Sequence, residues 1–202
     1  MENKNSSLKQ FITQFILIVF SVVLGLYLSE RIEDRKKKRE SEELLSTIKS
    51  EVVDNIRLIE EWQPYHLEIN NNLDSLSKDE EFIEEFIDNR YTLLDKLLTK
   101  GTFMGRRPAS DAWDIAKSHP LIVNIDYEKW MILSRVYNQQ EVTFEPAMEL
   151  IELLESRDVN EQSVAQQNLE IMANHWRDFV AREEQLVYYF RQAEEILNLA
   201  TD

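Results

Sequence analysis

The most unusual local chemistry of this sequence lies in the stretch GTFMGRRP at positions 101–108, where Arg106 and Arg107 stand side by side. A guanidinium presents a planar fork of N–H donors, so two adjacent arginines can hold an anion or the carboxylate of a protein partner. The same side chains can instead pair with acidic residues of their own chain, such as Asp111 and Asp114. We favour this internal pairing and keep Arg106 and Arg107 as a candidate contact for an anion or a partner.

The three histidines, His66, His119 and His175, belong to no metal-binding or catalytic motif. H-E-x-x-H and the E-x-x-H pattern of di-iron bundles are absent, as are G-x-G-x-x-G, the Walker loop and G-x-S-x-G. Neighbouring acidic residues are expected by chance in a chain that has 38 of them. We therefore predict a protein that is not an enzyme, with no catalytic residue, metal or cofactor. His119 is expected in a turn, and His175 on a helix surface or at the edge of the core.

Composition narrows the classes of function and fold. Lys and Arg number 23 against 38 Asp and Glu, a net charge of −15, so nucleic acid, which needs a basic face, is not an expected partner. The absence of cysteine removes disulfides, thiolate metal sites and cysteine nucleophiles. Three glycines and four prolines are too few for the tight turns of a sandwich or barrel. The composition therefore favours an all-α protein.

The clearest element is the uncharged segment at residues 11–28, whose 18 residues would form a helix of about 27 Å. This length matches the hydrocarbon core of a bilayer, and the segment lacks the broad polar stripe that a core helix of a soluble domain usually keeps. A cleaved signal peptide would need a more basic leader and an A-x-A site, and neither is present. We predict a transmembrane helix here.

The distribution of basic residues predicts the orientation of this helix. Six basic residues follow it within residues 29–40, whereas only Lys4 and Lys9 precede it. Basic residues close to a span are retained in the cytoplasm. We therefore predict a single-pass inner-membrane protein, with residues 1–10 as a short tail outside and the C-terminal domain in the cytoplasm.

Two further contacts of the anchor can be expected. The basic collar at residues 31–39 can attract anionic lipid headgroups, although an orientation signal explains it without a specific lipid site. Ser21, Gly25 and Ser29 lie four residues apart, and small residues at this spacing let two helices approach closely. They are the candidate face for helix association in a homo-oligomer.

Residues 29–62 are predicted to continue as the basic collar and a helical stalk. Pro64 should end this helix, because proline lacks the N–H and restricts the residue before it. The stalk's apolar stripe could pair with another chain as a coiled coil, but fewer than four heptads favour packing within the domain. The stripe recurs at steps of three and four, at Leu45, Ile48, Val52, Ile56 and Ile59.

Residues 63–202 are predicted to form an acidic helical bundle of about six helices, so that the fold class is all-α throughout. Residues 41–202 contain 15 basic and 33 acidic residues, a net charge of −18. Ser110 and Asp126 are expected to be helix N-caps, Pro146 to kink or split a helix, and residues 121–125 to be too short for a sheet. Helices are expected at 65–76, at 82–87 with continuation to 98, at 110–117, at 127–157 and from about 163 to 200. The large aromatics are expected in the core, at Trp113, Trp130 and Tyr137.

The stretches SDAWDIAKSHPLIVNIDY, from Ser110, and LSRVYNQQE resemble a group of uncharacterised bacterial membrane proteins. That group has an uncleaved N-terminal anchor, a basic collar, a helical stalk and a Trp-containing helical domain. The resemblance implies this architecture for about a third of the chain, with His119-Pro120 in place of the usual glycine, and it implies no activity. The matching positions are Ala112, Trp113, Ala116, Asp126, Tyr127, Leu133, Tyr137 and Gln140.

These observations predict a membrane-anchored, non-catalytic interaction or scaffold protein, including the version in which it is a subunit of a larger membrane complex. Its expected partners are membrane lipids, through the anchor and the collar, and a protein that the sequence does not identify. The alternative is a membrane-tethered sensor or effector that responds to a ligand bound in the helical domain. A sizeable apolar cavity with convergent polar groups around Trp113, His119 and Arg106 would favour the alternative.

Overall fold

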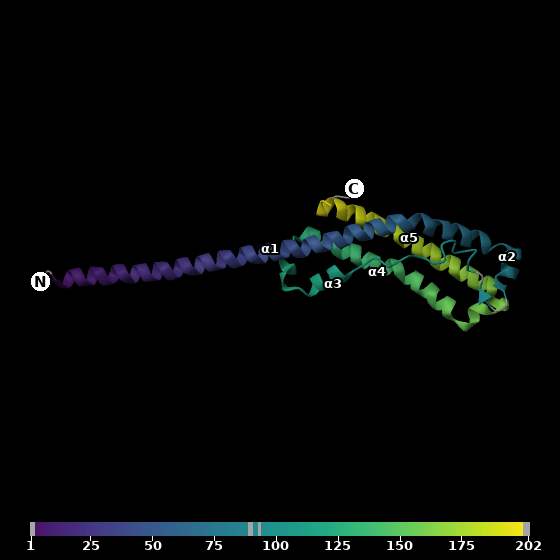
Figure 1. The fold of residues 1–202 in the computed structure, drawn as a ribbon, viewed down its shortest axis with the longest axis horizontal. Helices are drawn as coiled ribbons and strands as arrows, with labels where there is room; N and C mark the ends of the chain where they lie inside the picture. The colour runs from purple at the N-terminus through teal and green to yellow at the C-terminus, as the bar shows by residue number, and fades with distance from the viewer. Residues whose placement is uncertain (1–2, 89–90, 93, 200–202) are drawn as a thin grey trace.

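The computed structural model describes residues 3–88, 91–92 and 94–199 and shows an all-helical protein (Figure 1). Five α-helices carry the described part of the chain, with three short 3-10 helices and one antiparallel pair of two-residue strands. The helices are α1 (Asn3–Leu76), α2 (Glu80–Glu85), α3 (Asp111–Ser118), α4 (Tyr127–Glu155) and α5 (Ala165–Leu197), the strands are β1 (Ile87–Asp88) and β2 (Tyr91–Thr92), and the 3-10 helices are Pro120–Asn124, Arg157–Asn160 and Gln162–Val164.

The first part of α1, from Asn3 to about residue 39, projects far from the bundle formed by the other helices (Figure 1). An 18-residue window of α1 has a mean hydropathy of 2.0 and is 0% buried, so this helix is long and apolar enough to cross a membrane. Residues 13–39 are all exposed. Ion pairs one turn apart, such as Glu33 with Lys37 at 2.7 Å, support the helix where it has no tertiary contact.

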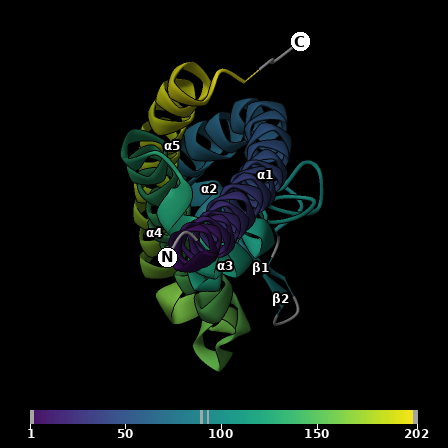
Figure 2. The ribbon, with the colours of Figure 1, turned by 90° about the vertical axis from the view of Figure 1, so that its left-hand side faces the viewer.

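The second part of α1 packs into the bundle through the predicted apolar stripe. Ile48, Val52 and Ile59 are 0% exposed and Ile56 is 4% exposed, which confirms packing within the domain over pairing with another chain. The stripe lies against α5, and α5 also packs against α4 (Figure 2). The core of the protein is therefore the space between these three helices.

The predicted end of α1 at Pro64 is wrong, because α1 continues through this proline to Leu76. A proline inside a helix costs roughly 3 kcal/mol. Ile59 and Ile69, on either side of it, are 0% and 1% exposed, and burial of one such side chain contributes about 1.5–3 kcal/mol. The indole N–H of Trp176 also donates to the His66 carbonyl at 2.8 Å. Burial on both sides of Pro64 therefore outweighs the cost of the proline.

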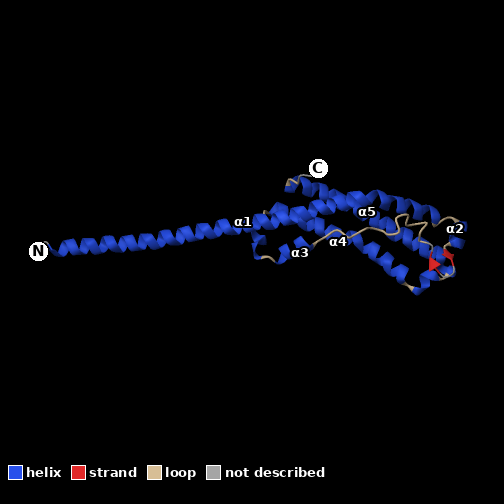
Figure 3. Cartoon of the chain, in the orientation of Figure 1, coloured by secondary structure: helices blue, strands red, loops and turns tan. Residues whose placement is uncertain are grey.

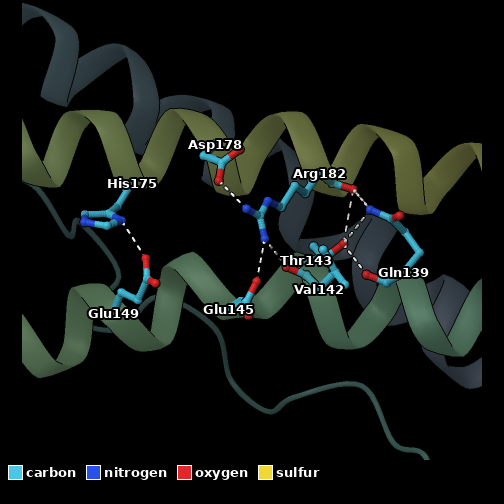
Figure 4. Close-up of polar contacts among 8 residues, drawn as sticks. All are labelled: Gln139, Val142, Thr143, Glu145, Glu149, His175, Asp178 and Arg182. Carbon is cyan, nitrogen blue, oxygen red and sulfur yellow. Dashed lines mark hydrogen bonds and ion pairs between the residues drawn. The ribbon is translucent and has the colours of Figure 1, made fainter.

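Pro146 does not split α4 either, and a side chain of α5 explains how the helix accommodates it (Figure 4). Proline has no N–H, so the Val142 carbonyl four residues earlier loses its usual helical donor. The Arg182 guanidinium replaces this donor, with Nη1 at 2.8 Å from the Val142 oxygen and 2.9 Å from a Glu145 carboxylate oxygen. Its Nη2 also lies 2.8 Å from Asp178.

The α4–α5 contact has two further polar links beside Arg182 (Figure 4). The amide of Gln139 and the hydroxyl of Thr143 both donate to the Arg182 carbonyl, each at 3.2 Å. About two turns of α5 before Arg182, His175 lies 3.0 Å from Glu149 and is partly exposed, which confirms its expected place at the edge of the core. These side chains fix how α4 and α5 pack together.

Several local predictions can now be compared with the fold. Asp126 is the N-cap of α4, as expected, and its carboxylate accepts from the Glu128 and Lys129 N–H groups. The predicted helical continuation to residue 98 is wrong, since α2 is short and turns follow β2. The bundle of about six helices is not confirmed, since the described residues contain five α-helices, of which α1 includes the predicted anchor. The apolar residues 120–124 form a 3-10 helix, with His119 at its N-cap in the expected turn.

The connection at residues 94–110 returns along the bundle to α3 and is drawn as a loop in Figure 3. It contains the GTFMGRRP stretch, which confirms the predicted loop. The apolar segment Leu97–Leu98 within it is buried and belongs to the core. The arrangement of this connection decides where Arg106 and Arg107 stand.

Candidate functional site

The segment 101–110, here called the arginine loop, is held by one face of α1. Four residues of α1 face it, and their spacing of four, seven and four positions places them on the same side of a helix. Three of them bind the loop or the start of α3 through polar atoms. The fourth, Trp62, lies against the loop, where a Cβ on Gly105 would lie 3.0 Å from its ring. The four residues are Glu51, Asn55, Trp62 and His66.

The side-chain amide of Asn55 makes two hydrogen bonds with the backbone of Ala109, at the end of the arginine loop. Its Nδ2 donates to the Ala109 carbonyl at 2.7 Å, and the Ala109 N–H donates back to its Oδ1 at 2.8 Å. The Gln140 amide from α4 donates to the carbonyls of Ala109 and Pro108 at 3.1 and 3.3 Å. Asn55 is 1% exposed, so both backbone groups of Ala109 are satisfied away from water.

Glu51 holds the beginning of α3. Its two carboxylate oxygens accept from the N–H groups of Ala112 at 2.8 Å and Trp113 at 3.3 Å, where a negative charge is favourable at a helix N-terminus. The hydroxyl of Tyr137 donates to the same carboxylate at 2.6 Å. Burial, followed by the hydrogen bond to Glu51, raises the pKa of Tyr137 far above its ordinary value.

This contact changes the role predicted for Ser110. Ser110 is the N-cap residue of α3, but its side chain makes no capping hydrogen bond. Its hydroxyl donates instead to Asp114 at 2.9 Å. Glu51 therefore performs from α1 the task expected of Ser110. Trp113 is buried and stacks on Tyr137 with ring centroids 5.1 Å apart, and Trp130 is 4.4 Å away, which confirms the predicted aromatic core.

His66 and Glu183 form a pair in the centre of the protein, and both side chains are 0% exposed. His66 Nε2 lies 3.0 Å from the Phe103 carbonyl, which only accepts, so this nitrogen carries a proton. Nδ1 lies 2.7 Å from Oε1 of Glu183, and these two atoms share a second proton. Oε2 of Glu183 has no hydrogen-bond partner among the described residues. The pair thus connects α5 and α1 to the backbone of the arginine loop.

Arg106 and Arg107 are exposed and take part in no ion pair with the residues that the structure describes. The favoured internal pairing with acidic residues is therefore wrong. Asp114 is occupied by Lys117 at 2.8 Å, which lowers the pKa of that carboxyl, and by Ser110. The Arg107 guanidinium instead lies 5.9 Å from the centre of the Phe144 ring and donates to the Met148 sulfur at 3.9 Å.

The arginine loop covers a mainly apolar cavity of about 200 Å³ between itself, α4 and α5. Arg106 and Arg107 line its edge, and His66 lies in its wall. On the opposite side of Arg107 a wider, polar depression of about 540 Å³ runs along α3 and includes Trp113. A cavity around Trp113, His119 and Arg106 would have favoured the sensor alternative, but the described residues form two hollows that share Arg107, and neither is lined by His119.

The candidate association face on the first part of α1 is accessible. Ser21 and Ser29 are exposed, and the Ser21 hydroxyl donates to the Leu17 carbonyl at 2.7 Å. A Cβ on Gly25 would have no atom within 4 Å. Self-association through this face stays a prediction. Within the described ranges, no group of three or more histidine or acidic side chains is arranged to hold a metal ion.

Comparisons with models of protein families, with curated proteins and with solved structures find no match to this chain. The resemblance carried by residues 110–141 therefore stays a prediction, and function has to be argued from the geometry.

The binding residues of α1 were not predicted from the sequence. Glu51 and Asn55 lie beside the apolar stripe of α1 rather than opposite it. Polar residues at this position were the available signal that this face of α1 binds another segment. His66 belongs to no local motif, because its partner, Glu183, is 117 residues away. No pattern near Glu183 distinguishes it from the exposed Glu184 that follows it.

Proposed function

We propose that this chain is a single-pass protein of the bacterial inner membrane that acts as a non-catalytic interaction module, as a subunit of a larger membrane complex. In this proposal the first part of α1 is the anchor, with its N-terminus outside, and the basic collar contacts anionic lipids. The helical domain lies in the cytoplasm and presents the arginine loop to a protein partner. The exposed apolar stretch of α1 supports the anchor.

The proposal is supported by two properties of the arginine loop, its exposed arginines and its fixed backbone. Its two guanidinium groups are exposed and free of ion pairs with the described residues, although the surrounding domain is strongly acidic. Its backbone is fixed at Phe103 by His66 and at Ala109 by Asn55. A loop already held in place loses little conformational freedom on binding, so more of the contact energy becomes affinity. We propose that the partner offers carboxylates to Arg106 and Arg107.

The proposal is tested by photo-crosslinking in intact membranes. A benzophenone amino acid replaces Thr102, which is exposed in the loop, or Tyr188, which is 58% exposed on α5. We expect a defined partner to be captured from position 102 and not from position 188. Charge reversal by Arg106→Glu and Arg107→Glu should abolish the capture. Equal capture from both positions, or capture that survives charge reversal, would contradict the proposal.

A matched control comes from two arginines outside the loop. Arg135 on α4 and Arg191 on α5 are also exposed and also lack an ion pair within the described part of the chain. Arg135→Glu with Arg191→Glu changes the net charge by the same amount as the loop variant. We expect this control to keep the crosslink from position 102, which separates a loop-specific contact from a general effect of charge.

A second candidate function, a membrane-tethered sensor or effector, is favoured by the cavity under the arginine loop. The same two arginines line the cavity and face solvent, so a ligand in the cavity would change the surface that a partner meets. We propose that occupancy of the cavity alters partner capture. The test is the photo-crosslinking yield from position 102 with and without a cavity ligand.

A further inference from the structure

We infer that the cavity under the arginine loop binds an amphiphilic carboxylate, a small molecule with a short alkyl chain and one anionic end. The binding of this ligand does not depend on the second candidate function. Only the use of the binding for sensing rests on that function. The binding itself follows from three properties of the cavity, which are its lining, its size and the charge at its edge.

The lining selects an apolar group. Six of the residues around the cavity are aromatic or methionine side chains, which bury large apolar area and adapt to the shape of a flexible chain. The polar atoms of His66 in the wall are already engaged by Glu183 and the Phe103 carbonyl, so they offer nothing to a polar ligand group. The six residues are Phe103, Met104, Phe144, Met148, Trp176 and Phe179.

The size limits the length of the chain. The cavity of about 200 Å³ is smaller than the roughly 300–1,000 Å³ of sites for drug-sized ligands. It has space for roughly six or seven groups the size of a water molecule, which occupies about 30 Å³ in the liquid. An alkyl chain of about six carbons therefore fills it, whereas a long acyl chain does not fit.

The charge at the edge selects an anion. Arg106 and Arg107 both line this cavity, and no carboxylate of the described residues neutralises them. A ligand carboxylate at the opening can accept hydrogen bonds from both guanidinium groups while its chain stays in the cavity. The corresponding amine would place a third positive charge beside the two arginines, and the corresponding alcohol would leave both unpaired.

The position of the cavity distinguishes a dissolved ligand from a bilayer lipid. His66 lies 38 residues beyond Leu28, the last residue of the predicted anchor, and α1 is continuous between them. At 1.5 Å per residue this is about 57 Å along the helix axis. A headgroup in the bilayer does not reach the cavity when α1 stands upright. The ligand is therefore a carboxylate taken from solution.

The test uses the full chain in lipid nanodiscs with isotope-labelled methionine methyl groups, observed by NMR while hexanoate is added. Met104 and Met148 line the cavity and Met131 does not. We expect saturable shifts of the first two signals and none of Met131. Hexylamine and hexanol should produce no saturable shift at the same concentrations, and acetate should bind more weakly than hexanoate because it lacks the chain.

Arginine variants test the charged end. Arg106→Gln with Arg107→Gln should raise the Kd for hexanoate about tenfold or more, because hydrogen bonds to charged groups contribute that much. The charge-matched variant Arg135→Gln with Arg191→Gln should leave the Kd unchanged. Equal shifts at Met131, equal binding of hexylamine, or a Kd that is insensitive to the loop variant would each overturn the inference.

Two further outcomes are informative. One distinguishes a ligand from solution from a ligand in the bilayer, and the other distinguishes failure of the sensor function from failure of the binding site. Shifts that appear with a long-chain carboxylate placed in the nanodisc bilayer, and not with dissolved hexanoate, would overturn a ligand taken from solution. Saturable binding of hexanoate without any change in photo-crosslinking from position 102 would contradict the sensor function and leave the binding site in place. Unchanged Met104 and Met148 signals would overturn the site itself.

Discussion

Replacing Glu183 with leucine should destabilise the helical domain by about 3–5 kcal/mol, because it removes one partner of the buried His66–Glu183 pair. Both side chains are 0% exposed and lie 2.7 Å apart, so bulk solvent does not reach them to replace a lost partner. His66→Phe should cost a similar amount, since it leaves the Glu183 carboxylate unpaired. Folded domains are stable by only about 5–15 kcal/mol, so either change removes a large fraction of the total.

The double variant distinguishes this explanation from a simple loss of packing. His66→Phe with Glu183→Leu replaces the pair with two apolar side chains of a volume similar to the side chains they replace. Only the Phe103 carbonyl then loses its donor. One unsatisfied buried acceptor costs about 1–3 kcal/mol. The double variant should therefore be more stable than either single variant. Glu184→Leu, at the exposed neighbouring position, is the control and should change stability by less than about 0.5 kcal/mol.

Urea unfolding in detergent micelles, followed by tryptophan fluorescence, measures these free energies of unfolding. The chain has four tryptophans, and all of them lie beyond residue 60, so the signal reports the helical domain and not the anchor. A Glu183→Leu variant within about 1 kcal/mol of the parent would refute the reasoning. So would a double variant whose destabilisation equals the sum of the two single values, because a coupled pair is not additive.

Three further predictions concern the loop, the helix contact and the buried tyrosine. Asn55→Ala leaves the Ala109 N–H unpaired and leaves Gln140 as the remaining donor to the Ala109 carbonyl, so we expect a loss of about 1–3 kcal/mol in urea unfolding and faster hydrogen exchange at Ala109, and unchanged exchange would contradict it. Arg182→Ala should destabilise the domain by about 1–3 kcal/mol, because it removes the donor to the Val142 carbonyl. The loss should be smaller in a Pro146→Ala background, where residue 146 again has an N–H for that carbonyl. Equal losses in both backgrounds would contradict the role of Arg182 as the replacement donor. Tyr137 has a raised pKa, so its stabilisation is complete below the ordinary value of about 10 and declines above it. The stability difference between the parent and Tyr137→Phe should therefore shrink between about pH 10 and pH 11, and a constant difference would oppose the assignment.

The sequence predicted those parts of the fold that depend on local patterns. The stripe from Ile48 to Ile59 and the N-cap at Asp126 were found because each is encoded within a few neighbouring residues. Pro64 misled the prediction, since the penalty of a proline is local whereas the burial that overcomes it comes from α5. Local signals compete with distant packing, and at this position packing prevails.

The candidate site was predictable only in part, for the same reason. The composition of the loop identified Arg106 and Arg107 as unusual, and they do line a cavity. Their predicted pairing with acidic residues such as Asp114 is not found, because Asp114 contacts Lys117 and Ser110 instead. The residues that fix the loop come from α1 and α5, up to 117 positions apart, and no spacing in the sequence connects them.

The central claim is that the chain holds its arginine loop at a membrane, inside the cell. The most direct measurement uses the absence of native cysteine, which makes any introduced thiol unique. Ser6→Cys lies in the predicted outside tail, and Ser163→Cys is exposed on the helical domain. A membrane-impermeant maleimide should label position 6 in intact cells and position 163 only after lysis, with the protein retained in washed membranes. Labelling of position 163 in intact cells, or loss of the protein from washed membranes, would contradict the account.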